Sequence, residues 1–191
     1  HTNNDGNTPF ILSCKRKTEI IALRMIETGK INISHTNKYG HNALYYADIY
    51  KLKNVAKKII EIEAQTDNIS NHDNYGDTLL IWACRYSMKD IAIGLIETGK
   101  ANISHANNSG NTALIMACKY SLNEVAIKLI DIDKGNIYHA NKYGTTALMA
   151  ACTNSLEDVA IKLIETGKTE IVDINNANIK NTDKHGNTAL I

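Results

Sequence analysis

A glycine returns along this chain at a nearly constant interval, and this period constrains the fold more than any other feature of the sequence. The glycines open six similar phrases: GNTPF, GHNAL, GDTLL, GNTAL, GTTAL and GNTAL. They lie 34, 36, 34, 34 and 42 residues apart, at Gly6, Gly40, Gly76, Gly110, Gly144 and Gly186. A period of this length through a whole chain indicates a stack of similar small units, not one globule with one active site.

The composition argues against several classes of protein. The formal net charge of the 191 residues is +1, whereas domains dedicated to polyanions carry a strong basic excess. No apolar run is long enough to span a bilayer, and no signal-peptide pattern is visible. We therefore expect neither a membrane segment nor a dedicated nucleic-acid domain.

The four cysteines occupy one slot of the repeating unit, at Cys14, Cys84, Cys118 and Cys152. Stacked helices lie about 8–10 Å apart, whereas a disulfide requires Cα atoms within about 6.8 Å. Cysteines in equivalent slots therefore cannot easily bond to each other. We interpret them as small apolar residues on the packed side of a helix. Reduced, buried thiols are typical of a cytoplasmic or nuclear protein.

The fourth unit shows how each repeat is predicted to fold. Residues 112–120 contain no helix breaker and place Ala113, Leu114, Ala117 and Cys118 on one helical face. The next four residues, Ser-Leu-Asn-Glu at 121–124, have the form of a capping box. The same signature begins at Ser87 and Ser155. A second helix follows, with apolar residues at helical spacing over 125–130.

A loop closes each unit. The second helix is predicted to end at a glycine, which can adopt the left-handed exit conformation, at Gly29, Gly99 and Gly167. Further on, Asn107 and Gly110 are the first and fourth residues of a tetrad that suits a type I turn at a hairpin tip. The unit is therefore helix, tight turn, helix and β-hairpin loop.

This pattern resembles the ankyrin repeat over essentially the whole chain. The matching elements are Asp/Asn-x-x-Gly-x-Thr-x-Leu, then Ala-Cys, then Ile/Val-Ala-x-x-Leu-Ile. The resemblance implies an all-α solenoid of stacked helix-turn-helix repeats with β-hairpin loops, curved and elongated. We expect one array over residues 1–191, with repeats at 2–35, 36–71, 72–105, 106–139 and 140–181 and the start of a sixth at 182–191. Residues 169–176 form an insertion in the fifth repeat, and the array is expected to continue beyond both ends.

The second repeat departs from the others at three positions. Asp48 occupies the cysteine slot, Lys51 the slot of the capping serine, and Glu63 the slot of the exit glycine. An acid at a packing position costs stability unless it is hydrogen-bonded or reaches solvent. Two interpretations stay open: local degeneration of a repeat, or a kink that contacts a partner.

The resemblance also implies a function, because ankyrin arrays bind other proteins along a groove formed by the hairpin tips and the first helices. The corresponding positions carry tyrosines interleaved with basic groups, a mixture that offers large contact areas and anchors of binding energy. It suggests a protein or peptide partner with acidic character and apolar anchors. The alternative is that these tyrosines pack flat between repeats and cover the edge of the core. The predicted partner-binding residues are Tyr39, Tyr50, Tyr75, Trp82, Arg85, Tyr86, Lys119, Tyr120, Lys142 and Tyr143.

No pattern of a catalytic or metal site is visible. Four histidines share one slot, at His1, His35, His105 and His139. Zinc ligands must lie about 2.0–2.1 Å from the metal, so histidines one repeat apart cannot share an ion, and we predict hydrogen bonding along the hairpin row instead. The sequence shows no nucleophile elbow or phosphate loop. We therefore predict a non-catalytic scaffold without cofactor, metal or small-molecule substrate. A nucleic-acid binder that uses the Tyr/Lys row is the alternative that the near-zero net charge disfavours.

Overall fold

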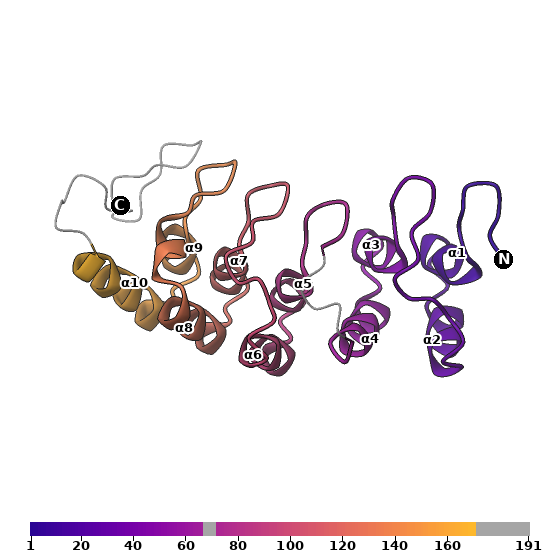
Figure 1. The fold of residues 1–191 in the computed structure, drawn as a ribbon, viewed down its shortest axis with the longest axis horizontal. Coiled ribbons are helices and arrows are strands. Elements are labelled where there is room, and N and C mark those ends of the chain that lie inside the picture. The colour runs from indigo at the N-terminus through magenta and orange to yellow at the C-terminus, as the bar shows by residue number, and fades with distance from the viewer. Residues whose placement is uncertain (67–71, 171–191) are drawn as a thin grey trace. The chain divides into compact units, whose positions relative to one another are not determined.

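The computed structural model describes residues 1–66 and 72–170 of the chain. The predicted start of a sixth repeat lies outside these residues, as does most of the predicted insertion at 169–176. The described residues form ten α-helices and one short 3₁₀ helix, with no β-strand (Figure 1). The predicted all-α repeat fold is confirmed. The helices are α1 (Pro9–Lys15), α2 (Glu19–Glu27), α3 (Ala43–Ile49), α4 (Lys53–Glu63), α5 (Leu79–Arg85), α6 (Lys89–Glu97), α7 (Ala113–Lys119), α8 (Asn123–Ile132), η1 (Lys134–Tyr138), α9 (Ala147–Thr153) and α10 (Glu157–Glu170).

The chain divides into two compact units, His1–Asn74 (unit 1) and Tyr75–Ile191 (unit 2). The division falls inside the third predicted repeat, 72–105. Within unit 1, α1 packs against α3 and α2 against α4. Within unit 2, the first helices α5, α7 and α9 lie next to the hairpin loops, and the second helices α6, α8 and α10 lie behind them (Figure 1). Each helix thus buries its apolar face against a neighbouring repeat of its own unit.

The first helix of every repeat begins at a side-chain cap. Thr8, Thr78, Thr112 and Thr146 each hold an extended N-cap conformation and accept a hydrogen bond from the backbone N–H three residues later, at 3.2–3.3 Å. Asn42 does the same in the second repeat, at 2.9 Å from Tyr45 N. A cap of this type contributes about 1 kcal/mol. The first helix of the irregular second repeat is therefore capped at its N-terminus like the others.

The tight turn between the two helices differs from the prediction. Ser121 does not cap α8, because its φ is 57°, in the left-handed region, and Leu122 occupies the N-cap without a side-chain hydrogen bond. Ser121 N–H donates to Cys118 O at 3.3 Å, and Leu122 N–H donates to Ala117 O at 2.9 Å. This pair of bonds is a Schellman motif, which satisfies the carbonyls at the end of α7. The predicted capping boxes are wrong, since the serine ends the first helix and does not start the second. Ser87, Ser155, Lys17 and Lys51 have the same left-handed conformation.

Two of the three predicted helix exits are confirmed. Gly29 and Gly99 have φ values of 64° and 66° directly after α2 and α6. Gly167 does not end its helix, because α10 runs on through it to Glu170. A glycine inside a helix costs only about 1 kcal/mol relative to alanine, so the flanking residues can carry the helix through it.

The cysteine slot is part of the core in three repeats. Cys14, Cys84 and Cys118 are buried, and burial raises the pKa of these thiols to about 11, 12 and 12. Cys152 is exposed instead, so the predicted packed position is wrong for that residue. All four cysteines are free thiols, as the spacing argument required.

The hairpin tips have the predicted turn. Gly110 N–H donates to Asn107 O at 2.7 Å, and the φ of Gly110 is 77°. The side chain of Asn107 reinforces the turn by accepting from Ser109 N–H at 3.0 Å and from Asn111 N–H at 2.8 Å. Below the tip the hairpin is joined by one antiparallel bridge, between Ala106 and Thr112.

The histidine row forms hydrogen bonds between repeats, as predicted. Nε2 of His35, His105 and His139 lies 2.9, 2.7 and 2.7 Å from the carbonyl oxygen of Gly6, Gly76 and Gly110, respectively. Because a carbonyl oxygen only accepts, Nε2 must carry the proton in all three rings. Each histidine thus ties its hairpin to the turn of the preceding repeat.

Candidate interaction surfaces

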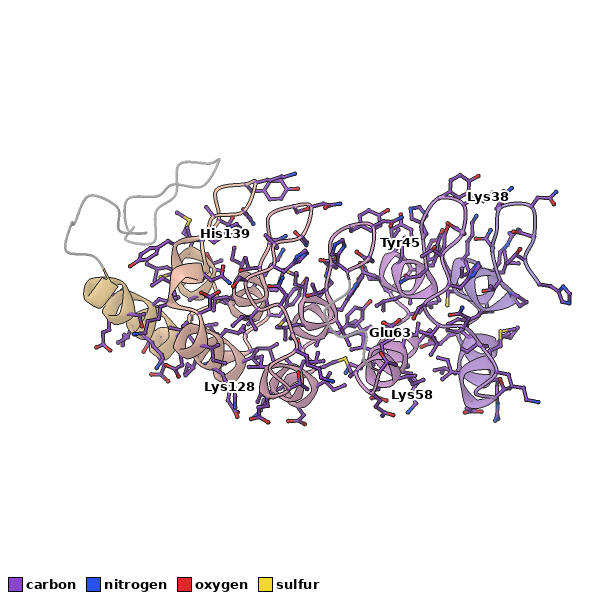
Figure 2. All side chains as sticks on the ribbon, in the orientation of Figure 1. Lys38, Tyr45, Lys58, Glu63, Lys128 and His139 are labelled. Atoms are coloured by element: carbon purple, nitrogen blue, oxygen red, sulfur yellow. The ribbon has the colours of Figure 1, made fainter. Side chains whose placement is uncertain are left out.

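The predicted partner-binding residues lie at the hairpin tips and at the ends of the first helices, and each unit presents its own set. Backbone hydrogen bonds join neighbouring tips within a unit. In unit 1, Lys38 N–H donates to Asp5 O at 2.9 Å. In unit 2, Asn108 N–H donates to Tyr75 O at 2.8 Å and Lys142 N–H to Ser109 O at 3.0 Å. Figure 2 shows Lys38 at its tip and Lys58 at the opposite edge of unit 1.

Unit 1 carries a cluster of aromatic rings and lysines, which we call the unit 1 cluster. The His41 ring stacks on Tyr45, with ring centroids 3.9 Å apart, and meets Tyr46 edge-on at 5.7 Å. Tyr46 in turn stacks against Tyr50 at 6.4 Å, while Tyr39 lies 6.3 Å from His41. The cluster consists of Lys15, Lys17, Tyr39, His41, Tyr45, Tyr46 and Tyr50.

The lysines of the unit 1 cluster come from α1 and from the turn that follows it. Lys15 Nζ lies 5.8 Å from the centroid of the Tyr46 ring, and Lys17 Nζ lies 5.0 Å from that of Tyr50. Both distances are within the range of cation–π attraction. Burial, and secondly the charge of Lys15, lowers the pKa of His41 from its ordinary value of 6.5. The neutral form of the His41 imidazole is therefore favoured beside Lys15.

Sequence reasoning selected two members of the unit 1 cluster and missed the others. Tyr39 and Tyr50 were predicted, and Tyr39 is 63 % exposed. His41, Tyr45 and Tyr46 were not, although their slots hold smaller or aliphatic residues in most other repeats. The slot of Tyr45 holds isoleucine or methionine in the first, third, fourth and fifth repeats, and this replacement of an aliphatic by an aromatic residue is the signal that would have found Tyr45.

Unit 2 carries a different arrangement, which we call the unit 2 surface. The Arg85 guanidinium lies 4.6 Å above the Trp82 ring, and its Nη2 donates to Asp77 Oδ2 at 2.8 Å. Asp77 Oδ1 accepts from Asn107 Nδ2 at 2.6 Å. Tyr86 lies 6.0 Å from Trp82. The surface consists of these side chains with Lys119, Tyr120 and the tip residues Tyr75, Lys142 and Tyr143.

One predicted contact residue of unit 2 lies in the core. Trp82 is only 4 % exposed and lies beneath the Arg85 guanidinium, so it offers a partner almost no area. The two tip tyrosines remain available, with Tyr75 39 % and Tyr143 49 % exposed. Lys119 Nζ lies 5.9 Å from the ring centroid of Tyr120, so a cation and a ring are again presented together.

The two unusual acids of the second repeat avoid an unpaired buried charge. Asp48 is half-buried, so a carboxylate in the cysteine slot still reaches solvent. Glu63 accepts from Ser34 Oγ at 3.2 Å. Burial raises the pKa of Glu63, the Ser34 hydrogen bond opposes that shift, and the charge of Asp73 adds to it. Neither acid requires a partner molecule.

The second helices present a charged face away from the tips, where Figure 2 shows Lys58 and Lys128. In unit 2 the ion pairs join neighbouring repeats: Lys128 Nζ lies 2.6 Å from Glu97 Oε1, and Lys162 Nζ lies 2.6 Å from Asp131 Oδ1. In unit 1 the ion pair of Lys58 lies within α4, at 3.1 Å from Glu61. Exposed pairs of this kind contribute about 0–1 kcal/mol each, so this face is a solvated surface.

Within the described ranges, no group of three or more His, Cys, Asp or Glu side chains is arranged to hold a metal ion. In the same part of the chain, no helix is both long enough and apolar enough to cross a bilayer.

The comparison with protein families decides the identity of the fold. The family model described as ankyrin repeats (three copies) matches residues 51–139 and 100–176. The chain belongs to the ankyrin-repeat family. Ankyrin repeats are protein-interaction modules and are typically non-catalytic.

Comparison with individual proteins adds a likeness of fold. No curated protein matches the chain by sequence. Among solved structures, one chain of the complex of the predatory endopeptidase Bd0816 from Bdellovibrio bacteriovorus with immunity protein Bd3460 is similar, with a TM-score of 0.58 and 22 % identity. The match covers 100 % of this chain and 90 % of that one. At this identity the likeness concerns the fold alone.

Proposed function

We propose that this ankyrin-repeat chain is a non-catalytic scaffold that binds a protein or peptide through its hairpin tips and first helices. The family consists of protein-interaction modules, and the similar solved structure is a complex of two proteins. The contact residues would be those of the unit 1 cluster and the unit 2 surface, within the array of repeats proposed from the sequence. Three buried, free thiols favour a reducing compartment.

The observation that carries this proposal is the exposure of aromatic rings at the tips, with Tyr39, Tyr75 and Tyr143 all exposed. Tyrosine gives a large contact area with few rotatable bonds to order, which is why it is enriched in binding surfaces. Lysines and an arginine lie over neighbouring rings. A partner with acidic groups beside apolar anchors would complement this combination of cations and rings.

The test compares two triple variants that remove similar exposed apolar area from opposite faces. Peptides are first selected from a displayed library against the whole chain, and their affinities are then measured by calorimetry. We expect Tyr39→Ala/Tyr75→Ala/Tyr143→Ala to weaken binding about tenfold or more, as loss of aromatic anchors does. The control, Ile20→Ala/Ile132→Ala/Ile161→Ala, removes exposed isoleucines of the second helices and should leave affinity nearly unchanged.

The opposite ranking of the two triple variants would place the binding face on the second helices and refute the proposal. A single-stranded oligonucleotide provides a further comparison. Should it bind more tightly than any selected peptide, with an affinity that falls steeply as salt is raised, the chain would be a nucleic-acid binder instead.

A further inference from the structure

One slot is filled differently in the first repeat, which lies in unit 1, and in the third repeat, and the difference exposes a missing acceptor in the first. The slot directly after the turn glycine holds Asn7 in the first repeat and Asp77 in the third. Eight residues later the first repeat has Lys15 and the third has Arg85. The fourth repeat also has asparagine and lysine in these slots, at Asn111 and Lys119, but Asn111 is only half-buried. Both Asn7 and Asp77 are almost fully buried, at 1 % and 4 % exposure.

In the third repeat both oxygens of the Asp77 carboxylate accept hydrogen bonds. Asp77 Oδ1 accepts from Asn107 Nδ2 at 2.6 Å, and Asp77 Oδ2 accepts from Arg85 Nη2 at 2.8 Å. One carboxylate therefore satisfies the amide of the next hairpin and the cation of its own first helix. A charge-assisted bond of this kind is stronger than a neutral one.

In unit 1 the same slot is incomplete. Asn37 Oδ1 accepts from the backbone N–H groups of Tyr39 and His41, both at 3.0 Å, so the NH₂ group of Asn37 must face Asn7. Asn37 Nδ2 donates to Asn7 Oδ1 at 2.8 Å, which fixes the orientation of the Asn7 amide. Asn7 Nδ2 is then left buried, with no hydrogen-bond partner within residues 1–66 and 72–170.

The residue in the Arg85 slot cannot repair this defect. Lys15 is an ammonium with three donors and no acceptor, and Asn7 Nδ2 is likewise only a donor. Two donors therefore fill the sequence slots that in the third repeat hold an aspartate and its arginine. A buried donor without a partner is destabilising because its lost hydration is not replaced. An added carboxylate would satisfy both groups.

The surroundings of Lys15 suit a carboxylate that arrives on a peptide. Tyr46 lies under Lys15, and its hydroxyl accepts from Asn37 Nδ2 at 3.2 Å. His41 and the exposed Tyr39 continue the aromatic surface toward the hairpin tip. Rings next to cations would cover the apolar stem of an acidic side chain and its apolar neighbours.

We propose that the unit 1 cluster binds one side-chain carboxylate of an acidic peptide, with Lys15 Nζ and Asn7 Nδ2 as the two donors. This inference rests on the proposed function, because it names the partner chemistry of one part of that surface. The occupant is a glutamate or aspartate flanked by apolar residues. A carboxylate is favoured over a phosphate because Asp77 fills the equivalent slot of unit 2 with a single carboxylate. Lys15 is half-buried and Asn7 is 1 % exposed, so the side chains that cover Asn7 must shift for the carboxylate to reach it.

The first experiment compares two synthetic peptides. One contains a glutamate flanked by leucine and phenylalanine, and the other has a glutamine in place of that glutamate. Binding to the whole chain is followed by two-dimensional ¹H–¹⁵N NMR. We expect the glutamate peptide to bind about tenfold or more tightly than the glutamine peptide, as charge-assisted bonds require, and to shift the Asn7 side-chain signals. Equal affinities, or tighter binding of a phosphoserine peptide, would overturn the proposal.

The second experiment changes the slot itself. Asn7→Asp places in unit 1 the carboxylate that unit 2 already has, so it should abolish glutamate-peptide binding while leaving the thermal midpoint equal or higher. Lys15→Met removes the cation and should weaken binding about tenfold. The matched control is Lys128→Met, which removes a cation from the second helices and should change nothing. Binding that survives both Asn7→Asp and Lys15→Met refutes the carboxylate site.

The two proposals fail in different ways. If the selected partner is lost with the tip-tyrosine variant but tolerates Asn7→Asp and Lys15→Met, the interaction surface stands and the carboxylate site is wrong. If the tip-tyrosine variant keeps full affinity, the proposed function itself is wrong.

Discussion

The two units are built from the same repeat but complete its polar slots in different ways. In unit 2 the Asp77 carboxylate accepts hydrogen bonds from Asn107 and from Arg85, and ion pairs such as Lys128–Glu97 join neighbouring second helices. In unit 1 the corresponding region holds stacked aromatic rings, two lysines and a buried amide donor without an acceptor. The fixed slots therefore specify the fold in both units, whereas the variable slots decide which side chains each surface presents.

The largest effect on stability is expected at a buried leucine slot of the repeat, and it tests whether this slot contributes equally in the two units. Leu44 in unit 1 and Leu114 in unit 2 hold the same position of the repeat and are both buried. Each change to alanine should cost about 2–5 kcal/mol, since it removes buried carbons and leaves a cavity. Urea unfolding followed by circular dichroism measures both, and fluorescence of Trp82, the only tryptophan, reports on unit 2. If either variant lowers the free energy of unfolding by less than about 1 kcal/mol, the two leucines are not equivalent.

The next effect concerns the completed polar slot of unit 2. Asp77→Asn replaces a charge-assisted bond to Arg85 by an amide, so stability should fall by about 1–3 kcal/mol. The same unfolding assay applies, and the mirror change Asn7→Asp in unit 1 provides the comparison. Stability that does not fall with Asp77→Asn would show that the Arg85 pair is no stronger than a solvated surface pair.

A smaller effect of opposite sign is expected at the turn between helices. Ser121 holds a left-handed conformation that costs a side-chain-bearing residue about 1–2 kcal/mol. Ser121→Gly should therefore stabilise unit 2 by about 0.5 kcal/mol, after allowance for the greater entropy of an unfolded glycine. Lys17→Gly in unit 1 should gain less, because Lys17 also lies over the Tyr50 ring. Thermal unfolding ranks the two variants, and a destabilising Ser121→Gly would contradict the assigned backbone conformation.

The last prediction concerns the pH dependence of stability that His41 gives to unit 1. Burial and Lys15 lower the pKa of His41 in the folded state, so the unfolded chain takes up the proton first as the pH falls. Stability from this group is complete above about pH 6.5 and declines below it. The groups that face His41 are Lys15 from α1, Tyr39 from the tip, and Tyr45 and Tyr46 from α3.

The matched variant for that prediction is His41→Asn, since asparagine fills this slot in the first and fourth repeats. Thermal midpoints measured on either side of the ordinary histidine pKa, about pH 7.5 and 5.5, should differ less in the variant than in the parent chain. Identical differences in the two chains would show that His41 does not contribute.

The repeat period and the local patterns within one unit predicted the helix pairs and the Asn-x-x-Gly tips, because each depends on residues close together in sequence. The Ser121 turn was misjudged because a serine before an acid has the same local pattern whether it starts one helix or ends another. Only the bond from Leu122 to Ala117, which depends on the geometry of both helices, distinguishes the two. The unit 1 cluster was found only in part, since Lys15 and Tyr46 lie 31 positions apart and the period gives no reason to pair them.

The backbone bonds between neighbouring tips have a consequence for association kinetics and entropy. With Lys38 held to Asp5, and Asn108 to Tyr75, adjoining loops are ordered before any partner arrives. Immobilising a free loop is one of the main costs of forming a complex. Here the loops are ordered before binding. A flexible peptide would therefore bind with little rearrangement of the hairpin loops, and most of the entropy cost would come from the peptide.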